Sequence, residues 1–514
     1  MEQLSLLGEG LAGVLTPMNL TLLLIGALLG TAVGVLPGLG SAMAVALLLP
    51  VTFTLDPTGA FIMFASIYFG GLFGDSTSGI LLNTPGNSSA IATTFEGHRM
   101  ARSGRAAKAL GISAIGAFTG GMIACACVVM FSPYLIVLAR AFSSPEYFAL
   151  AVFAFVAISA VVAESVVRGL AALGLGLALA LVGTDSMTGT QRFTLDNPSL
   201  FEGISIIVIT VGLLALGEVL HQASRIHREA HIGGPVTTEG SPFPTRKEMR
   251  RIVPAFLRGT AFGLPFGTIP VGGSEVPTFL AYGTEKALAA RRHDPDFGSR
   301  GALQGVAAPE AAGNATAGSA MGALLVLGLP TSATAAMMLA AFQQYGMQPG
   351  PLLFETSAAL VWPLLASLFV GLIILLIINL PFAAVWAKLL LIPRHYLYAG
   401  VTVIAMLGTY AISSSTLDLW MVIAIGIVGF LMRRYSIPLA PVLIAAILGP
   451  LAELELRRSL AQSEGDVSIL FSSTITLTLY ALLAAAVAAS IIQHARHRRR
   501  RRVEAAERVE PAAR

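Results

Sequence analysis

Long apolar runs fill most of the chain, and short polar interruptions gather in two regions of it. Unbroken runs such as Ala109–Val137 and Ala358–Pro381 exceed the roughly 20 residues that a helix needs to cross a bilayer. Shorter runs, separated by glycine, proline and small polar residues, occupy 34–95 and 256–345. Because backbone freed inside a membrane needs a buried partner, the pattern predicts an all-α polytopic membrane protein with broken or re-entrant helices in these regions.

The composition agrees with a membrane protein and excludes an ordinary soluble one. Of the 514 residues, 55% are hydrophobic and 12% are charged, whereas a soluble domain carries about 25% charged residues. Glycine is abundant, with 53 residues, as expected where helices pack closely in lipid. The two cysteines, Cys125 and Cys127, form neither a disulfide framework nor a zinc motif.

The two interrupted regions contain three motifs in the same order, and the two copies of each motif are separated by similar lengths of chain. The pairs are Pro37-Gly38-Leu39-Gly40-Ser41 with Pro270-Val271-Gly272-Gly273-Ser274, Gly74–Gly79 with Gly313–Gly318, and Pro85–Ala90 with Pro330–Ala335. Three ordered matches predict two repeats within the chain. We expect repeat 1 at 1–220 (motifs in 34–95), a cytoplasmic join loop at 221–255, repeat 2 at 256–452 (motifs in 263–345), an external loop and final helix at 453–493, and a basic cytoplasmic tail at 494–514.

The basic residues predict that the repeats have opposite orientations, because loops rich in Lys and Arg face the cytoplasm. The segment 99–108 contains four such residues, and its counterpart 343–351 contains none. Conversely, 286–300 contains four, and its counterpart 51–58 contains none. We therefore expect inverted-topology repeats, a periplasmic N-terminus, a cytoplasmic C-terminus and one extra C-terminal transmembrane helix near Ile475–Ile492.

The interruptions also predict an anion site near mid-membrane. A helix that begins after each proline offers free N–H groups and the positive end of its dipole. Neighbouring hydroxyl and amide groups add neutral partners, and none of these segments contains Lys or Arg. The candidate substrate-binding residues are Pro37, Gly38, Gly40, Ser41, Pro85, Gly86, Asn87, Ser88, Pro270, Gly273, Ser274, Pro330, Thr331 and Ser332.

A second candidate site would take a coupling ion, either Na⁺ or a proton. Broken helices release carbonyl groups, which coordinate hard cations, and Asp75 is the only acid in its motif. The candidate ion-binding residues are Asp75, Thr77, Asn314, Thr316 and Glu310. Structural alternatives stay open: the Gly/Pro motifs could be packing kinks, Asp75 could be a paired structural acid, and Glu275 and Glu310 could be solvated at segment ends.

The sequence contains no HExxH, P-loop or GxSxG motif, so we expect no enzyme and no cofactor besides the coupling ion. Repeats with broken helices and a buried acid favour a secondary transporter. The alternatives are a passive anion channel and a membrane-embedded enzyme.

Three stretches carry a resemblance to a known family: GVLPGLGSAMAVALLLP, YFGGLFGDSTSGILLNTPG and PEAAGNATAGSAMGALLVLGLPTSATAA. The loop from Gly183 to Thr194 adds to it. In these motifs the chain resembles the large membrane subunit of the tripartite tricarboxylate transporters. The resemblance implies a permease of the bacterial inner membrane that works with a small membrane subunit and a periplasmic solute-binding protein. It further implies uptake of a di- or tricarboxylate, or a related organic acid, driven by an ion gradient.

The separation of short, broken spans from long, unbroken ones suggests a mechanism. We expect the two interrupted regions to form a mobile, elevator-like unit that carries substrate past a fixed scaffold. The long spans, such as Ala109–Val137 and Ala358–Pro381, would form that scaffold.

Overall fold

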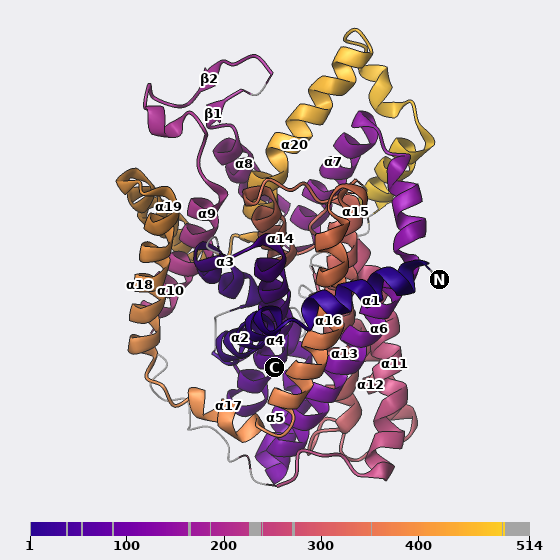
Figure 1. The fold of residues 1–514 in the computed structure, drawn as a ribbon. Helices are drawn as coiled ribbons and strands as arrows, with labels where there is room; N and C mark the ends of the chain where they lie inside the picture. Colours follow the sequence, from indigo (N-terminus) through magenta and orange to yellow (C-terminus); the bar gives the residue numbers. More distant parts are fainter. Residues whose placement is uncertain are drawn as a thin grey trace, which may run out of the picture.

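The computed structural model describes residues 2–36, 40–52, 55–84, 87–162, 166–185, 187–225, 238, 240–269, 273–350, 352–485 and 487–488. Within these ranges the elements are helices, apart from one antiparallel pair, β1 (Gly183–Thr184) and β2 (Gln191–Arg192) (Figure 1). The helices before residue 240 are α1 (Glu2–Val14), α2 (Pro17–Val35), α3 (Ser41–Thr52), α4 (Pro57–Leu82), η1 (Ser88–Ala90), α5 (Ile91–Met100), η2 (Ala101–Arg105), α6 (Ala106–Arg140), α7 (Ser144–Val162), α8 (Val166–Ala180), η3 (Pro198–Leu200), α9 (Ile206–Thr210), η4 (Val211–Leu216) and α10 (Gly217–Ala223).

The helices after residue 240 begin with α11 (Arg246–Thr268), α12 (Glu275–Arg291), α13 (Leu303–Leu327), α14 (Ala333–Gln344), α15 (Leu353–Thr356) and α16 (Ala358–Asn379). They continue with α17 (Ala383–Leu389), α18 (Arg394–Ser413), α19 (Thr416–Arg434), α20 (Ala440–Gln462), η5 (Val467–Phe471) and an apolar helix at Thr474–Ala485. In the described part of the chain, six helical segments are long and apolar enough to cross a membrane. The predicted all-α, membrane-spanning class is therefore confirmed, and the basic tail lies outside the described residues.

The helix breaks occur at two of the three repeated motifs. Helices end before and begin after the segments at 36–40, 83–87, 269–274 and 328–332. The motifs at Gly74–Gly79 and Gly313–Gly318 were also predicted to be breaks, but they lie inside the continuous helices α4 and α13. Their hydroxyl groups satisfy local backbone carbonyls, as Thr316 Oγ1 does by donating to Ala312 O at 2.8 Å. Small polar residues serve here as close-packing positions within helices.

The helix α20 is longer than the apolar run that predicted it. That run ends at Leu448, and an external loop was expected from residue 453, yet α20 continues to Gln462. The added turns are polar and carry an ion pair between Arg458 and Glu455 at 2.9 Å. Hydropathy alone does not detect such an extension, because it lies beyond the apolar part of the helix.

Two glycine series bring helix backbones into direct contact. On α2 the series is Gly26, Gly30 and Gly34, and a Cβ at Gly30 would lie 2.5 Å from the Ile67 carbonyl oxygen of α4. A series with the same spacing recurs on α11 as Gly259, Gly263 and Gly267. There, a Cβ at Gly263 would lie 2.3 Å from the Ala312 carbonyl oxygen of α13. These are small-xxx-small contacts of the kind that hold transmembrane helices together.

The same contacts align α4 with α13, because Ile67 and Ala312 occupy equivalent places against the two glycine series. The C-terminal ends of the two helices support this alignment. The helix α4 ends at Asn83 (φ 59°) and α13 at Gly328 (φ 69°), and both residues have the left-handed conformation that terminates helices. The predicted match of Asp75 with Asn314 does not keep this alignment. In the observed alignment, Asp75 corresponds to Ala320.

We expect Gly30→Leu to destabilise the protein by about 1–3 kcal/mol, because a side chain at this position must push α2 away from α4. The thermal unfolding midpoint of the purified full-length chain in detergent would report this loss. Gly174→Leu is the matched control, since Gly174 of α8 has open space around it. An equal effect of the two substitutions would contradict a packing role for Gly30.

Close backbone contacts at the described glycines divide most long helices into two groups. The first group includes α1, α2, α4, α6, α11, α13 and α16; for example, a Cβ at Gly120 of α6 would lie 2.1 Å from Ala311 O of α13. In the second group, glycines join α8 to α20 and η4 and α10 to α19; for example, a Cβ at Gly176 of α8 would lie 2.3 Å from Val442 O of α20. The helices α7, α9 and α18 pack against these helices without glycine contacts and complete the second group. None of the described glycines makes such a contact between the groups. The expectation that Ala109–Val137 and Ala358–Pro381 form a separate scaffold is therefore wrong, because α6 and α16 pack within the first group.

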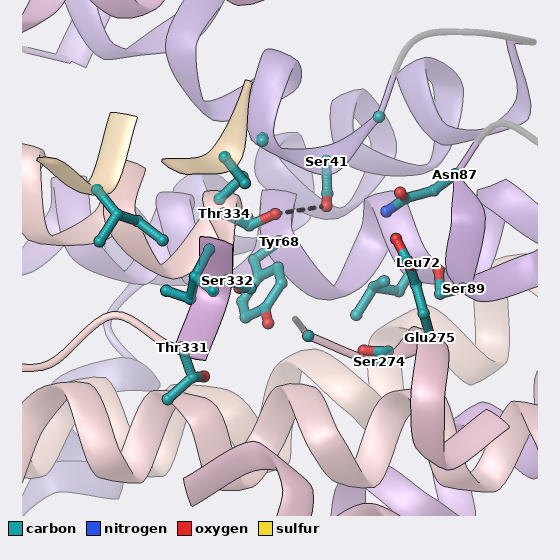
Figure 2. Close-up of a pocket in the computed structure, with 17 residues that line it drawn as sticks. Ser41, Tyr68, Leu72, Asn87, Ser89, Ser274, Glu275, Thr331, Ser332 and Thr334 are labelled. Carbon is teal, nitrogen blue, oxygen red and sulfur yellow. Dashed lines mark hydrogen bonds between the residues drawn. The ribbon is translucent and has the colours of Figure 1, made fainter. Parts of the chain in front are cut away.

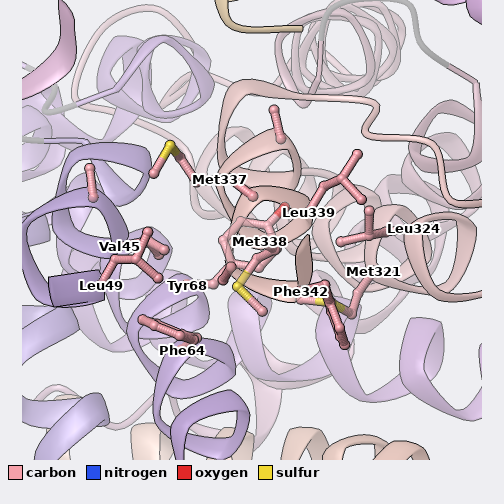
Figure 3. Close-up of a cluster of buried hydrophobic side chains, with 14 of the residues drawn as sticks. Val45, Leu49, Phe64, Tyr68, Met321, Leu324, Met337, Met338, Leu339 and Phe342 are labelled. Atoms are coloured by element: carbon pink, nitrogen blue, oxygen red, sulfur yellow. The ribbon is translucent and has the colours of Figure 1, made fainter. Parts of the chain in front are cut away.

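The short helices α3 and α14 lie side by side between these groups (Figure 1). Their shared core contains Val45 and Leu49 of α3, with Met338 and Phe342 of α14 (Figure 3). Phe342 also stacks on Phe61 of α4, with ring centroids 3.9 Å apart. This apolar core holds both short helices against α4, and the packing thereby fixes where the first residues of α3 and α14 lie.

Candidate functional site

The described residues of the four interrupted segments converge on one cavity of about 150 Å³ (Figure 2). It is lined at the start of α3, just before α5, at the start of α12 and at the start of α14. Two helices of the second group close the remaining side through Ile158 of α7 and Ala440 and Ile444 of α20. The lining residues are Gly40, Ser41, Ala42, Tyr68, Leu72, Asn87, Ser89, Ile158, Gly273, Ser274, Glu275, Thr331, Ser332, Ala333, Thr334, Ala440 and Ile444.

The helices α3 and α14 meet at both of their ends. At the cavity, the hydroxyl groups of Ser41 and Thr334 are hydrogen-bonded at 3.0 Å. At the far ends, Tyr345 Oη donates to Thr52 O at 2.7 Å. The two helices are therefore parallel, and both direct their N-terminal ends at the cavity. The cap of α14 is Ser332, whose hydroxyl accepts from Ala335 N at 3.2 Å.

The helices α5 and α12 form a second pair of the same kind. Phe95 of α5 contacts Tyr282 of α12 with ring centroids 5.2 Å apart. Tyr282 Oη also donates to the buried carboxylate of Glu96 at 3.3 Å. Each of the four short helices thus packs on one from the other part of the chain. The N-terminal ends of α3, α12 and α14, and the turn before α5, surround the cavity, so it lies in a region of positive helix-end potential.

Seven predicted substrate residues line the cavity: Gly40, Ser41, Asn87, Gly273, Ser274, Thr331 and Ser332. Pro330 is buried next to them but is not part of the lining. Ser88 begins η1, and its side chain is outside the described residues. Also outside the described residues are Pro37, Gly38, Pro85, Gly86 and Pro270.

The sequence reasoning missed several lining residues. Thr334 lies just past the motif residue Ser332, so the helical turn after each break was the available signal. Tyr68 and Leu72 come from the middle of α4, one turn apart, and lie outside the three repeated motifs. Glu275, for which the sequence left open a solvated place at a segment end, begins α12 and lines the cavity.

The predicted ion ligands are buried at the crossing of α4 and α13 rather than in the cavity. Asp75, Thr77, Asn314, Thr316 and Glu310 are each less than 9% exposed. Ser76 donates a hydrogen bond to the Glu310 carboxylate, which joins the two helices. Glu310 is therefore not a solvated segment end, which was the structural alternative for it.

The two acids at this crossing have different surroundings. Asp75 accepts a hydrogen bond from Ser89 at 3.1 Å, and Ser89 lines the cavity. Asn314 donates to the Glu310 carbonyl at 3.1 Å within α13, and the hydroxyl of Thr316 is bonded to backbone carbonyls. In the described part of the chain, no three His, Cys, Asp or Glu side chains gather as metal ligands do. Asp75 is thus the candidate ion residue that connects directly to the cavity wall.

An ion-pair cluster holds the β1–β2 hairpin against the polar end of α20. The Asp185 carboxylate pairs with Arg457 at 2.8 Å and with Arg192 at 3.0 Å. Hydrogen bonds from the backbone of Thr188 and Met187, together with these arginines, lower the pKa of Asp185 to about 2. The described residues between Gly183 and Thr194 therefore form a charged structure at the end of the molecule opposite α5 and α17 (Figure 1).

A comparison with known families resolves what kind of protein forms this cavity. The family described as "Tripartite tricarboxylate transporter TctA family" matches residues 20–444. The chain belongs to this transporter family. It is accordingly a multi-pass membrane component of a transport system and not an enzyme, as the sequence predicted. Membership in a tripartite system also implies partner subunits.

Two relatives from Agrobacterium vitis extend the comparison. The "Uncharacterized 52.8 kDa protein in TAR-I ttuC' 3'region" is 38% identical over 499 residues, which cover 97% of this chain and 98% of that protein. The "Uncharacterized protein in TAR-II ttuC' 3'region" is 35% identical over 237 residues, which cover 46% of this chain and 97% of that protein. No solved structure matches the chain. The TctA match spans both interrupted regions, so the whole cavity lies inside the family's shared sequence.

Proposed function

We propose that the chain is the subunit in which a carboxylate crosses the membrane, in an ion-gradient-driven secondary transporter. The observation that carries this proposal is the cavity at which the ends of short helices converge. Its lining combines hydroxyl, amide and helix-end N–H groups, which bind an anion without cationic side chains. The substrate class that fits both this lining and the TctA family is a di- or tricarboxylate or a related organic acid.

We further infer that the chain consists of two inverted repeats at 1–220 and 256–452. The glycine series of α2 and its equally spaced counterpart on α11 support this. The pairing of α3 with α14 and of α12 with α5 supports it too, because a two-fold axis in the membrane plane exchanges the two pairs. The hairpins α2–α3 and α11–α12 then enter from opposite sides, and their tips meet at the cavity.

The repeats set the orientation of the molecule. The basic segments 99–108, 246–251 and 286–300 meet at one end, where Arg105 donates to Arg300 O at 2.8 Å and Lys108 pairs with Glu248 at 2.8 Å. Arg140, Arg192 and Arg457 belong to the other end. By the positive-inside rule the first end is cytoplasmic. We accordingly expect the N-terminus in the periplasm and the C-terminus in the cytoplasm of the bacterial inner membrane.

The mechanism that we propose is elevator-like, with a revised division of the molecule. The first glycine-packed group, together with α3, α5, α12 and α14, would move as the transport unit. The second group, α7–α10 and α18–α20, would be the scaffold. Backbone contacts through glycine hold together the helices of the first group and, in the second, α8 with α20 and α10 with α19, whereas side-chain contacts between the groups would allow sliding.

Na⁺ or a proton would drive this transport, with Asp75 as its first candidate site, since its partner Ser89 reaches the cavity. A periplasmic solute-binding protein would deliver the carboxylate to the hairpin end of the molecule. A small integral membrane subunit would complete the system. The chain itself would need no ATP site, in line with an ion gradient as the energy source.

Counterflow in proteoliposomes that contain the complete transporter tests the proposal. Vesicles preloaded with unlabelled carboxylate should accumulate labelled carboxylate transiently above equilibrium, because an alternating-access carrier exchanges the two. Ser332→Ala should raise the concentration needed for half-maximal counterflow, since it removes a cavity hydroxyl. Labelled carboxylate that only equilibrates, with no overshoot, would favour the passive anion channel.

A further inference from the structure

One buried acid at the crossing of α4 and α13 is surrounded by hydroxyl groups. Glu310 of α13 is 4% exposed, and Ser76 of α4 donates a hydrogen bond to its carboxylate. The hydroxyl groups of Thr93 of α5 and Ser113 of α6 also face this carboxylate. A Cβ at Gly116 of α6 would lie 2.9 Å from the Glu310 Cβ, so α6 packs directly on the side chain. Three helices besides α13 therefore enclose Glu310.

Hydroxyl neighbours distinguish Glu310 from two other buried acids near it. Glu96 of α5 accepts from backbone N–H groups and pairs with Arg99 at 2.8 Å. Glu285 of α12 pairs with Arg258 of α11 at 2.7 Å. Such partners can only donate, so they hold these two acids as carboxylates. A hydroxyl group can donate to a carboxylate and can rotate to accept from a carboxylic acid, so Glu310 has partners in both protonation states.

The charged and titratable groups on the helices around Glu310 have other partners. They are Asp75 of α4 with Ser89, Glu96 of α5 with Arg99, His98 of α5 with Ile80 O, Lys108 of α6 with Glu248 of α11, and Arg258 of α11 with Glu285 of α12, while Glu275 of α12 lines the cavity. Among the described residues, no Lys, Arg or His forms an ion pair with Glu310. A buried charge without a cationic partner is costly, and binding a proton removes that cost.

Glu310 lies one helical turn behind the cavity on two sides. On α13, Gly313 is the next turn, and its carbonyl accepts from the cavity residue Ser274 at 3.2 Å (Figure 2). On the other side, Thr93 follows the cavity residue Ser89 by one turn. A negative charge in the cavity therefore disfavours the charged form of Glu310. By reciprocity, a proton on Glu310 favours the binding of a carboxylate in the cavity.

We propose that Glu310 carries a proton together with the carboxylate substrate and so links transport to a proton gradient. This inference rests on the proposed function, since the cavity must be the substrate site, and it deepens that function by naming a coupling ion and its carrier. The proton binds the Glu310 carboxylate when the substrate occupies the cavity, and it leaves through the cavity after the substrate has left. Asp75 stays the candidate ion residue at the cavity wall.

The first test uses the proton itself as the probe. Infrared spectra of the purified full-length chain are recorded over a pH series for the wild type and for Glu310→Gln, which has the shape of the protonated acid. Their difference should contain the carbonyl band of one carboxylic acid, and this band should disappear as the pH rises. In Ser76→Ala the band should disappear at a higher pH, because the carboxylate has lost a donor. A difference spectrum without a titrating carbonyl band would overturn the assignment.

The matched control is Glu285→Gln, which also removes a buried acid. It should lower the thermal unfolding midpoint, since Arg258 loses its partner, and it should keep the titrating band of Glu310. A band that is lost in Glu285→Gln as well as in Glu310→Gln would come from a general change of the fold and would contradict the assignment.

The second test uses proteoliposomes that contain the complete transporter, with labelled citrate and malate as probes. Glu310→Gln should keep counterflow, because exchange needs no release of the proton. Accumulation driven by an imposed proton gradient should fall at least tenfold in this variant. Unchanged proton-driven accumulation would overturn the role of Glu310 in coupling. A wild type that shows the titrating band but no counterflow would instead count against the cavity as a carboxylate site, which separates the two failures.

Discussion

Oxidation of a Ser41→Cys, Thr334→Cys variant should abolish carboxylate uptake, and a reducing agent should restore it. The two hydroxyl oxygens are 3.0 Å apart, so sulfur atoms in their place can bond with little movement. The bond would fasten α3 to α14 at the cavity and prevent the substrate from entering or leaving between them. Uptake into proteoliposomes, measured before and after oxidation, would report the loss.

The inverted repeats that we propose add a second part to this expectation. In the alignment set by the glycine contacts, Ser274 is the counterpart of Ser41, and Ser89 is the counterpart of Thr334. Here Ser274 donates to Gly313 O at 3.2 Å and Ser89 to Asp75, so each is bonded within its own part of the chain. A Ser89→Cys, Ser274→Cys pair should therefore form its disulfide chiefly during turnover, when the opposite side closes.

Controls for these disulfides follow from the native cysteines and the single variants. Both experiments need a background in which Cys125 and Cys127 are replaced by Ser, since these are free thiols. Each single cysteine variant should take up the carboxylate equally well before and after oxidation. Full uptake by the oxidised Ser41→Cys, Thr334→Cys protein would show that the contact between α3 and α14 does not open in the transport cycle.

Asp75→Asn should reduce uptake driven by an ion gradient at least tenfold. Asp75 is 3% exposed, receives a hydrogen bond from the cavity residue Ser89, and corresponds to Ala320 when α4 is aligned with α13 through their glycine contacts. The substitution keeps the shape and removes the charge that would hold the coupling ion. Initial uptake rates with and without an imposed Na⁺ or proton gradient measure the effect.

Asp56→Asn on the same helix is the control for this substitution. Asp56 caps α4 and accepts from Gly59 N at 3.0 Å, and asparagine caps helices equally well. Uptake by Asp56→Asn should match the wild type in rate and ion dependence. Asp75→Asn with unchanged gradient-driven uptake would make Asp75 a structural acid.

The sequence predicted two kinds of feature: helices that coincide with apolar runs, and helix breaks at proline- and glycine-containing motifs that occur twice in the chain. The helices α6 and α16 agree with their predicted spans to within a few residues. The segments around Ser41, Ser274 and Ser332 were recognised because proline and glycine repeat there. Residues that reach the cavity from the middle of a helix, such as Tyr68, have no repeated proline–glycine motif beside them and could not be recognised in this way.

The errors have a common physical cause. Small polar residues in a membrane helix can mark a break or a close helix contact, and the composition of Gly74–Gly79 does not distinguish the two. The spacing of Gly26, Gly30 and Gly34 does distinguish them, because glycines at every fourth position lie on one helix face. A comparison of glycine spacing between the two halves of the chain would have shown which helices pack directly.

The hydrogen bond between Ser41 and Thr334 joins residues that are 293 positions apart in the chain. During synthesis, α3 is therefore made long before the helix against which it packs, and it must wait in the membrane or at its surface with part of its apolar face uncovered. A substitution that destabilises α14 leaves the first half of the chain in the membrane without the helix that covers α3. Such variants should be lost to membrane proteases and to slow assembly, and their effects in cells should exceed those on the purified protein.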